Sequence, residues 1–500
     1  MFLTSSLTTD LAVAIFFLTS VVTVFFKRSF QYWSRKHLPH PHPTIPFGNL
    51  PNPYKDGESI GVFLAHLYKE MKKVDPKHCG FYAFAKPCYC VFDLDYVKNV
   101  LSKDFQYFVD RGIYYNEKDD PISAHLFAIG GRKWQNLRKK LTPTFTSGRM
   151  KMMFQSLLKC ENSLYEAMED FCEKSEAVDI KEVLGCFTTD IIGSCAFGLD
   201  CNSFKDKESP FPKYGRKIFE STRLRSLLNS FSVSFPNLSR VLKIRQIPKD
   251  VGEFFTKIVT ESVRYREETS FFRKDFLQLL IELKNARILT IQEIVAQSFV
   301  FFAAGFETSS TTMTFALYEL AKNQRIQERL REEIEQVLRK HRGEISYESI
   351  QEMKYMNQVV DETLRKYPPI PFITRECIRD YKLPAENIII EKGTSVFIPI
   401  LGIHHDEEYY PDPEIFDPER FSEDNRRIRH QYAHIPFGQG PRICIGSRFG
   451  LMETKIGLTS ILKHFKLSVN SKTREPLMMS PQSFILAAVG DVWLNAKKIY

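Results

Sequence analysis

Apolar and polar positions along the chain follow a helical period over long stretches. Between Arg325 and Arg342, apolar residues recur at helical spacing and charges of both signs fill the other positions, which is typical of a solvent-facing helix. From Thr290 the letters TIQE predict a capping box, and the helical pattern continues to about Lys322. At 1.5 Å per residue, such a helix approaches roughly 50 Å. The pattern therefore predicts one helix long enough to cross a whole domain.

The first 26 residues contain an apolar run that interrupts this amphipathic pattern. Leu11 to Phe26 carries no charge, and Asp10 is the only charged residue before Lys27. With the uncharged polar residues before it, the run approaches the roughly 20 residues that a membrane-spanning helix needs. A secretory signal is the alternative, but no small-residue cleavage site follows. Basic residues follow at once, which favours retention of that side in the cytoplasm. We therefore expect residues 1–26 to form a single membrane anchor.

A basic and proline-rich segment, residues 27–50, follows the anchor. Its four prolines, in LPHPHPTIPFGNL, impose an extended backbone and remove amide donors. We expect a stiff linker that holds the catalytic domain, residues 51–500, at a set angle to the membrane. His40 and His42 lie in this linker and are expected to have no special role.

Composition and charge narrow the class of protein. Hydrophobic residues make up 43% of the chain and charged residues 26%, a globular balance. The net charge of +9 suits an acidic partner or membrane surface, and no basic run interleaved with aromatic residues favours nucleic acid. The 10 cysteines are scattered rather than densely spaced, so most are expected to be reduced, buried and inert.

The segment PFGQGPRICIGSRFG near the carboxyl end concentrates candidate chemistry. Gly438 and Gly440 permit a tight hairpin whose backbone could approach a flat ligand. Cys444 directly precedes a helical pattern, where free amide groups favour a thiolate over a thiol. A thiolate there could bind a soft metal or act as a nucleophile, although no nearby histidine offers a base. A dinucleotide-binding loop of the Gly-x-Gly-x-x-Gly type is disfavoured, because Ile443 stands at the sixth position, where that motif has its third glycine.

This segment resembles the Phe-x-x-Gly-x-Arg-x-Cys-x-Gly motif of the cytochrome P450 family. The five fixed positions are occupied by Phe437, Gly440, Arg442, Cys444 and Gly446. The resemblance implies a mainly α-helical fold with small β-sheets, in one large domain that binds haem b. It further implies Cys444 as the proximal iron ligand, Arg442 near a propionate and Phe437 beside the sulfur. Gly438 and Gly446 of the same loop are also expected to contact the cofactor.

The middle of the long helix, FFAAGFETSSTT, resembles the family's Ala-Gly-x-Glu-Thr motif. Glu307 stands in apolar surroundings, where a carboxylate is costly without a partner or a task. Gly305 removes side-chain bulk one turn before Thr308 and leaves room for a small ligand. The resemblance implies that Glu307 and Thr308 are catalytic and pass protons to bound oxygen. A core helix with back-bonded hydroxyls is the alternative.

Two further motifs match the family in order along the chain. Trp134 and Arg138, four residues apart on one helix face, resemble the pair that holds a haem propionate. The resemblance suggests Arg375 as a third propionate ligand and Arg111 as a weaker one. Glu362 and Arg365 resemble the family's Glu-x-x-Arg motif. Together with Arg420, they are expected to form a structural ion network. The two adjacent histidines His404 and His405 are expected in an exposed turn.

By the same analogy, five stretches supply the walls of the substrate pocket. They are 105–127, 219–235, 301–308, 370–374 and 483–486. Their many phenylalanines favour apolar, aromatic ligands, although a phenylalanine-rich stretch is more often core than pocket.

The resemblance implies a monooxygenase that inserts one atom of O2 into lipophilic small molecules. Electrons would come from NADPH through a separate NADPH-cytochrome reductase, with cytochrome b5 as a further partner, because no nicotinamide or flavin motif is present. The reductase would dock near Arg442 and Arg448. The segment QYAHIPFGQGPRICIG is similar to that of insect microsomal members that oxidise foreign compounds. This resemblance implies that the protein is located at the endoplasmic reticulum membrane. A haem-thiolate isomerase or dehydratase and a haem sensor without turnover remain the alternatives.

Overall fold

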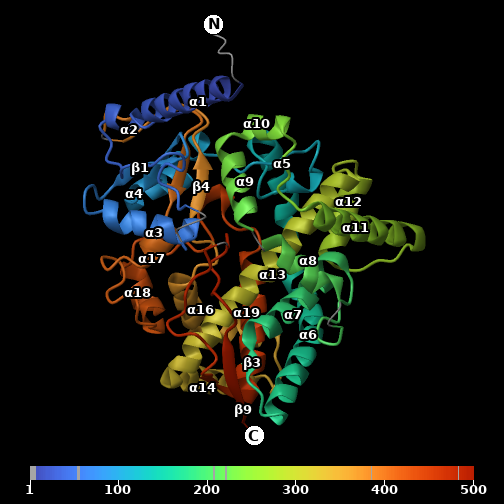
Figure 1. The fold of residues 1–500 in the computed structure, drawn as a ribbon. Helices are drawn as coiled ribbons and strands as arrows, with labels where there is room; N and C mark the ends of the chain where they lie inside the picture. The colour runs from blue at the N-terminus through green and yellow to red at the C-terminus, as the bar shows by residue number, and fades with distance from the viewer. Residues whose placement is uncertain are drawn as a thin grey trace.

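The computed structural model describes residues 7–52, 57–206, 209–219, 222–384, 386–481 and 483–499. Helices dominate it and the sheets are small, which confirms the predicted fold class (Figure 1). The α-helices are α1 Leu7–Ser29, α2 Tyr32–Arg35, α3 Ile60–Met71, α4 Leu94–Lys98, α5 Gly131–Leu141, α6 Ser147–Glu173, α7 Ile180–Ile192, α8 Pro210–Phe219, α9 Arg223–Ser234, α10 Pro236–Val241, α11 Lys249–Thr269, α12 Phe276–Asn285, α13 Ile291–Lys322, α14 Gln324–Lys340, α15 Tyr347–Glu352, α16 Lys354–Lys366, α17 Ile400–His404, α18 Glu423–Ile428 and α19 Ser447–His464.

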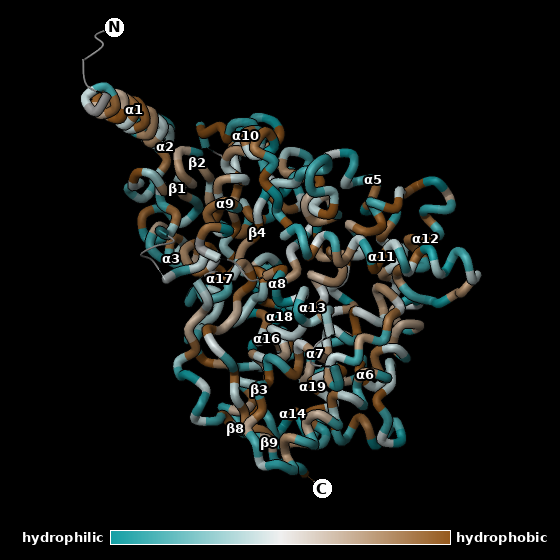
Figure 2. The backbone as a smooth tube through the Cα atoms, turned by 45° about the vertical axis from the view of Figure 1, so that its right-hand side comes forward, coloured by the Kyte–Doolittle hydropathy of each residue, from teal (hydrophilic) through white to brown (hydrophobic). Residues whose placement is uncertain are grey.

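Helix α1 is an apolar helix that projects from the body of the protein (Figure 2). Within the 27-residue stretch Thr9–Arg35, the most apolar window of 18 residues has a mean hydropathy of 2.1, and none of that window is buried. The length and composition suit a helix that crosses a bilayer. Residues 1–6 of the predicted anchor lie outside the described residues. The helix runs past Phe26, so Lys27 and Arg28 lie in its last turn.

The segment after α1 packs against the first strands of the domain. Trp33 is fully buried, and its indole Nε1 donates to the carbonyl of Phe81 at 3.1 Å. Leu38 is buried in the same hydrophobic cluster. Gly80 is required beneath this tryptophan, because an added Cβ would lie 2.4 Å from the Trp33 ring. These contacts support a fixed orientation of α1, while the division of the chain at residues 26 and 50 stays a prediction.

The principal sheet has four strands in the order β1-β2-β7-β4. β2 pairs antiparallel with β1 and parallel with β7, and β7 pairs antiparallel with β4. A three-stranded sheet of order β3-β9-β8 lies at the opposite end of the molecule (Figure 1), and β5 pairs with β6. The strands are β1 His78–Ala83, β2 Lys86–Val91, β3 Val178–Asp179, β4 Ile373–Glu376, β5 Tyr381–Lys382, β6 Ile389–Ile390, β7 Ser395–Ile398, β8 Phe465–Val469 and β9 Trp493–Lys498.

Helix α13 crosses the middle of the molecule, as the pattern from Thr290 to Lys322 predicts (Figure 1). Thr290 and Glu293 form the expected capping box. Apolar residues surround most of the helix, and it packs on α7, α11, α16 and α19. The helix therefore forms the axis on which the other long helices are arranged.

The buried apolar residues form two clusters, one among the long helices and one on the four-stranded sheet. Two phenylalanines of α13, Phe302 and Phe306, belong to the helical cluster and stack with ring centroids 5.7 Å apart. Phe302 also contacts the rings of Phe197 and Phe255. These phenylalanines are core, whereas Phe301 of the same stretch faces a cavity.

Candidate active site

The loop before α19 has the tight hairpin geometry that its glycines predict. Gly438 and Gly440 have φ values of +72° and +74°, a region that L side chains rarely adopt. A Cβ on Gly440 would lie 1.9 Å from the carbonyl oxygen of Leu101, so the backbone approach itself requires glycine. The amide of Cys444 donates to the carbonyl of Phe437 at 2.9 Å and closes the loop. Both Phe437 and Cys444 thereby reach the wall of the central cavity.

Cys444 carries the only thiol of this loop, and α19 begins three residues later. Backbone amides of Gly446 and Ser447 lower its pKa, as the position before a helix predicts, and so do the charges of Arg111 and Arg138. Burial raises the pKa more strongly, so the net direction is above the usual value. The amides at the helix start thus act in the direction that the sequence predicts, and burial opposes them. A metal ion bound to the sulfur would supply the missing stabilisation, because a coordinated thiol is deprotonated.

Four of the arginines that line the cavity interact electrostatically with one another or with Cys444: Arg111, Arg138, Arg375 and Arg442. Burial lowers the pKa of each one, to about 10 for Arg111 and about 9 for Arg442. The like charges of Arg111 and Arg442 lower the pKa of Arg375 further. Neither Nε of Arg375 nor Nε of Arg111 has a hydrogen-bond partner among the described residues. Such a cluster is stable only beside negative charge, so it fits an anionic ligand.

Arg442 is the most firmly held of these arginines. Its Nε donates to the carbonyl of Val109 at 2.6 Å and its Nη2 to the carbonyl of Ile129 at 2.8 Å. The guanidinium also lies 4.1 Å from the ring centroid of Trp134, a cation–π contact that the sequence did not predict. Arg442 is buried, so the expectation that it helps to form a docking surface for a reductase was wrong. Arg448 is exposed and remains available for such a surface.

Trp134 and Arg138 share one face of α5, as their spacing predicts, and both line the cavity. Trp134 is buried, while Arg138 is half-buried. Arg375 reaches the cavity from β4, whose alternation also directs Ile373 to it. Side chains from three distant parts of the chain thus surround the region next to Cys444.

The cavity has a volume of about 860 Å³ and lies where the two hydrophobic clusters meet. Each of the five predicted wall stretches contributes residues to it; Glu220 and Ser221 of stretch 219–235 lie outside the described residues. Sequence reasoning missed three further wall residues: Phe47 and Leu50, which lie between α2 and α3, and Phe84, which lies between β1 and β2. Phe276 of α12 was also missed, because helical periodicity does not distinguish a cavity from a core.

Helix α13 presents Ala304, Thr308 and Ser309 to the cavity. The Thr308 hydroxyl donates to the carbonyl of Ala304 at 2.5 Å. Gly305 also lies at the cavity, but an added Cβ would lie 2.3 Å from Cδ1 of Ile192. Close packing of α13 on α7 therefore requires this glycine, in addition to any room it leaves for a ligand.

Glu307 is buried but is not among the residues that line the cavity. Burial raises its pKa, and the charges of Lys181 on α7 and Arg216 on α8 oppose that shift. Glu307 and Thr308, the predicted catalytic pair, are thus adjacent in sequence but face different surroundings. Thr308 faces the cavity, and Glu307 faces cations on α7 and α8.

A family model, described as cytochrome P450, matches residues 38–494 of this chain. The chain belongs to the cytochrome P450 family. It is 42% identical over 497 residues to cytochrome P450 6a2 of Drosophila melanogaster, covering 96% of this chain and 98% of the relative. It is 43% identical over 493 residues to cytochrome P450 6A1 of Musca domestica, covering 96% of each chain. The protein is therefore a P450 monooxygenase, and the predicted family is confirmed.

Haem, the iron protoporphyrin IX of this family, carries two propionate groups. The residues at the cavity fit such a group. The sulfur of Cys444 lies on the wall beside a glycine-rich loop, and Arg111 and Arg375, whose Nε atoms have no hydrogen-bond partner among the described residues, line the same cavity. A thiolate ligand for the iron and cations for two carboxylates are the donor set that this cofactor requires.

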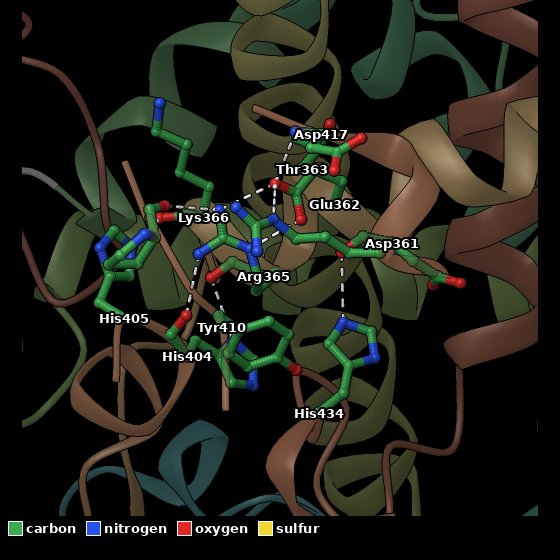
Figure 3. Close-up of polar contacts among 12 residues, drawn as sticks. Asp361, Glu362, Thr363, Arg365, Lys366, His404, His405, Tyr410, Asp417 and His434 are labelled. Carbon is green, nitrogen blue, oxygen red and sulfur yellow. Dashed lines mark hydrogen bonds and ion pairs between the residues drawn. The ribbon is translucent and has the colours of Figure 1, made fainter. Parts of the chain in front are cut away.

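Figure 3 shows the predicted ion network of this P450, which centres on Glu362 and Arg365 of α16. Glu362 and Arg365 are fully buried and form two bonds, Nε to Oε2 at 2.7 Å and Nη2 to Oε1 at 2.9 Å. Arg420 approaches Oε1 of Glu362 at 3.5 Å, and the amide of Asp417 donates to the same oxygen at 3.0 Å. The carboxylate therefore ties α16 to the segment that follows Asp412.

His404 is buried at the end of α17, so the expectation that both histidines lie in an exposed turn was wrong for it. The amide of Ile435 donates to its Nε2 at 3.1 Å, so Nδ1 carries the proton and donates to the carbonyl of Arg365 at 3.1 Å. Burial holds the pKa of His404 well below its usual value. This neutral ring links the ion network to the loop that carries Cys444, because Ile435 precedes Phe437.

Proposed function

We propose that this P450 oxidises lipophilic foreign compounds, such as plant toxins or insecticides, with electrons from NADPH delivered by a separate NADPH-cytochrome reductase. The observation that carries the proposal is the cavity, whose wall includes Cys444 on one side and Ala304 and Thr308 of α13 on another. Apolar and aromatic side chains form most of its wall, and a large cavity of this kind accepts lipophilic ligands of varied shape. Specificity for one polar metabolite would need more fixed polar groups.

Residue roles follow from the contacts at the cavity. Cys444 would supply the sulfur that binds the haem iron, and Phe437, Gly438 and Gly446 would shape the loop around the sulfur. The propionate ligands are Trp134, Arg138, Arg375 and Arg442, with Arg111 as a further cation. When bound, the haem activates dioxygen at its iron, and an axial thiolate favours cleavage of the O–O bond.

Thr308 and Glu307 are the proposed catalytic pair on the opposite side of the cavity. The Thr308 hydroxyl is placed to donate a hydrogen bond into the cavity once it turns from the Ala304 carbonyl. Glu307 lies between α13 and the cationic side chains of α7 and α8, and rotation of its carboxyl group would carry a proton from that side of α13 toward the cavity. A positioned proton donor of this kind typically accelerates a reaction by about 10²-fold or more.

The reductase is proposed to dock on the face of the protein next to Cys444. Arg448 is exposed there and reaches the hydroxyl of Ser147 at 3.3 Å. Lys139 and Lys140 are exposed in the last turn of α5. This basic surface complements an acidic electron donor, either the reductase or cytochrome b5.

The proposed location is the endoplasmic reticulum membrane, with the catalytic domain on the cytosolic side. The apolar α1 is the proposed anchor, and basic residues at its end favour the cytosol. Wall residues Phe47 and Leu50 follow the proposed anchor in the chain, so we expect one side of the cavity to lie close to the membrane, from which lipophilic substrates would enter.

The test combines the full chain with NADPH-cytochrome reductase in membranes and a lipophilic probe substrate. We expect an oxidised product that requires NADPH, reductase and O2. Cys444→Ser should abolish this product and the reduced carbon monoxide absorption band of thiolate-ligated haem. The matched control is Cys172→Ser, a partly exposed thiol of α6 away from the cavity.

Two alternative activities predict other results. Turnover of a lipid peroxide without NADPH or reductase would favour an isomerase or dehydratase. Intact thiolate-ligated haem without any turnover would favour a sensor. Either result would contradict the proposed function.

A further inference from the structure

Two polar side chains on the wall of the central cavity lack the hydrogen bonds that buried polar atoms usually make. They are His125, in the segment before α5, and Gln246, in the segment between α10 and α11. Nδ1 of His125 and Nε2 of Gln246 are buried and have no hydrogen-bond partner among the described residues. Leaving such an atom unpaired costs free energy, so this pair calls for an explanation.

The backbone fixes the position of both residues. The carbonyl of His125 accepts from the amide of Ala128 at 3.0 Å. The amide of Gln246 donates to Oδ2 of the buried Asp120 at 2.9 Å, and its carbonyl accepts from Nη2 of Arg225 at 3.1 Å. Asp120 belongs to the same segment as His125, so its bond holds the two segments against each other. Both side chains are therefore in place before a ligand arrives, which reduces the entropy that binding costs.

The ring of His125 is uncharged at physiological pH, because burial lowers its pKa to about 4. A neutral imidazole carries one N–H group and one acceptor nitrogen. Since Nδ1 is buried while the ring lines the cavity, Nε2 is the nitrogen that the ring presents to a ligand. Nδ1 has no acceptor among the described residues, which favours the tautomer with the proton on Nε2. His125 can therefore donate a hydrogen bond into the cavity.

Gln246 can supply a second donor. Its side chain lines the cavity, and Nε2 makes no bond within the described part of the chain that a rotation would break. A turn about the last side-chain bond, which has a broad torsion, brings either the oxygen or the N–H group to a ligand. Two uncharged donors suit a neutral acceptor such as a carbonyl oxygen. Without a charge, they do not offset the cost of burying an anion.

His125 marks the end of the cavity that lies away from the proposed oxygen site. Its ring centroid lies 6.1 Å from that of Phe299 in α13. Thr308 follows nine residues later in the same helix, which at 1.5 Å per residue is roughly 14 Å along the axis. Ala303 and Ala304 line the cavity between these two levels. A ligand held at His125 must therefore extend along an apolar wall to reach Thr308.

Helix α9 adds further polar groups to this part of the wall. Ser226, Asn229 and Ser230 line the cavity and, at spacings of three and four residues, share one face of the helix. Arg225, near the start of α9, donates to the carbonyl of Gln246, so the polar face begins beside that residue. The cavity thus has a polar end near α9 and an apolar wall along the first half of α13.

We propose that His125 and Gln246 form a polar subsite that binds the carbonyl group of lipophilic esters and lactones. The N–H groups of the two side chains donate to the oxygen atoms of the ester, and its apolar remainder lies along α13. Oxidation then falls on the end of the substrate opposite the carbonyl group. The subsite recognises a functional group rather than one molecule, so it agrees with a broad range of lipophilic substrates. The inference rests on the proposed monooxygenase function, for which it names a substrate class and the position oxidised.

The first test measures binding to the haem-loaded full chain by the change in the haem absorption spectrum on addition of ligand. The probes are methyl dodecanoate, dodecanoic acid and tridecane, which share a long alkyl chain. We expect the ester to bind about five- to tenfold more tightly than the alkane, the gain from about one hydrogen bond. His125→Phe and Gln246→Leu should each remove most of that preference and keep the affinity for the alkane. His125→Gln keeps an N–H donor and should retain part of the preference.

Gln351→Leu is the matched control, because Gln351 is an exposed residue of α15 and its loss should leave the preference for the ester intact. Equal affinities for ester and alkane in the unaltered protein, or a preference that survives in both His125→Phe and Gln246→Leu, would overturn the proposal. Tighter binding of the acid than of the ester would also overturn it, because the subsite would then select anions.

The second test identifies the products formed from methyl dodecanoate with NADPH and the reductase. We expect the unaltered protein to oxidise the last carbons of the chain, farthest from the ester, and the two variants to spread oxidation over more positions. Oxidation next to the ester in the unaltered protein, or an unchanged product pattern in both variants, would overturn the proposal. Lack of NADPH-dependent product from all three probes would instead contradict the proposed function, and the binding ratios would still decide the subsite.

Discussion

The buried acid Glu453 should make the stability of the folded protein depend on pH in a defined window. An unfolded glutamate has a pKa of 4.5, and the folded protein raises that of Glu453 to about 8. Between these values the unfolded chain has lost the proton and the folded protein keeps it, so the folded state becomes less stable as the pH rises. The contribution of Glu453 to the free energy of unfolding is fully present below pH 4.5 and is lost as the pH approaches 8.

The size of the effect follows from the shift. One unit of pKa corresponds to about 1.4 kcal/mol, so each pH unit inside the window removes about that amount from the free energy of unfolding. From pH 5 to pH 8 the loss is about 4 kcal/mol, a large part of the roughly 5–15 kcal/mol that stabilises a typical protein. Glu453→Gln has no proton to lose and should lack this dependence.

The assay is urea unfolding of the detergent-solubilised full chain, followed by tryptophan fluorescence at several pH values. Subtracting the curve of Glu453→Gln from that of the unaltered protein cancels every group that both share. We expect the difference to fall by about 1.4 kcal/mol per pH unit up to about pH 8 and then to level off. A difference that stays constant from pH 5 to pH 8 would refute the reasoning, because it would mean that folding does not change the pKa of Glu453.

Four other substitutions test separate parts of the site. Gly440→Ala should lower haem retention, because φ is +74° and the new Cβ would meet the Leu101 carbonyl, whereas Gly343→Ala has positive φ without a clash and should retain haem. Glu362→Gln should lower the free energy of unfolding by about 3–5 kcal/mol in urea titrations, because it leaves Arg365 buried without its anion. Arg375→Gln should weaken haem affinity in transfer assays to apomyoglobin with an unchanged thiolate spectrum. Thr308→Ala should keep haem but divert NADPH to peroxide, and unchanged coupling would remove it from the proton path.

The sequence predicts those features that depend on neighbouring residues. The capping box at Thr290 and the glycine hairpin before Cys444 depend on local backbone geometry, and both are present in the structure. The five wall stretches also reach the cavity, but this expectation rests on family resemblance, since no periodicity marks a cavity.

Features that depend on distant contacts are harder to predict. His404 stands in the polar text HHDEEYYPDP, which favours an exposed turn, yet backbone groups of Arg365 and Ile435 satisfy both of its ring nitrogens. Glu453 likewise reads as one charge in an amphipathic helix. Composition records that a residue is polar, whereas burial depends on which other segments pack against it.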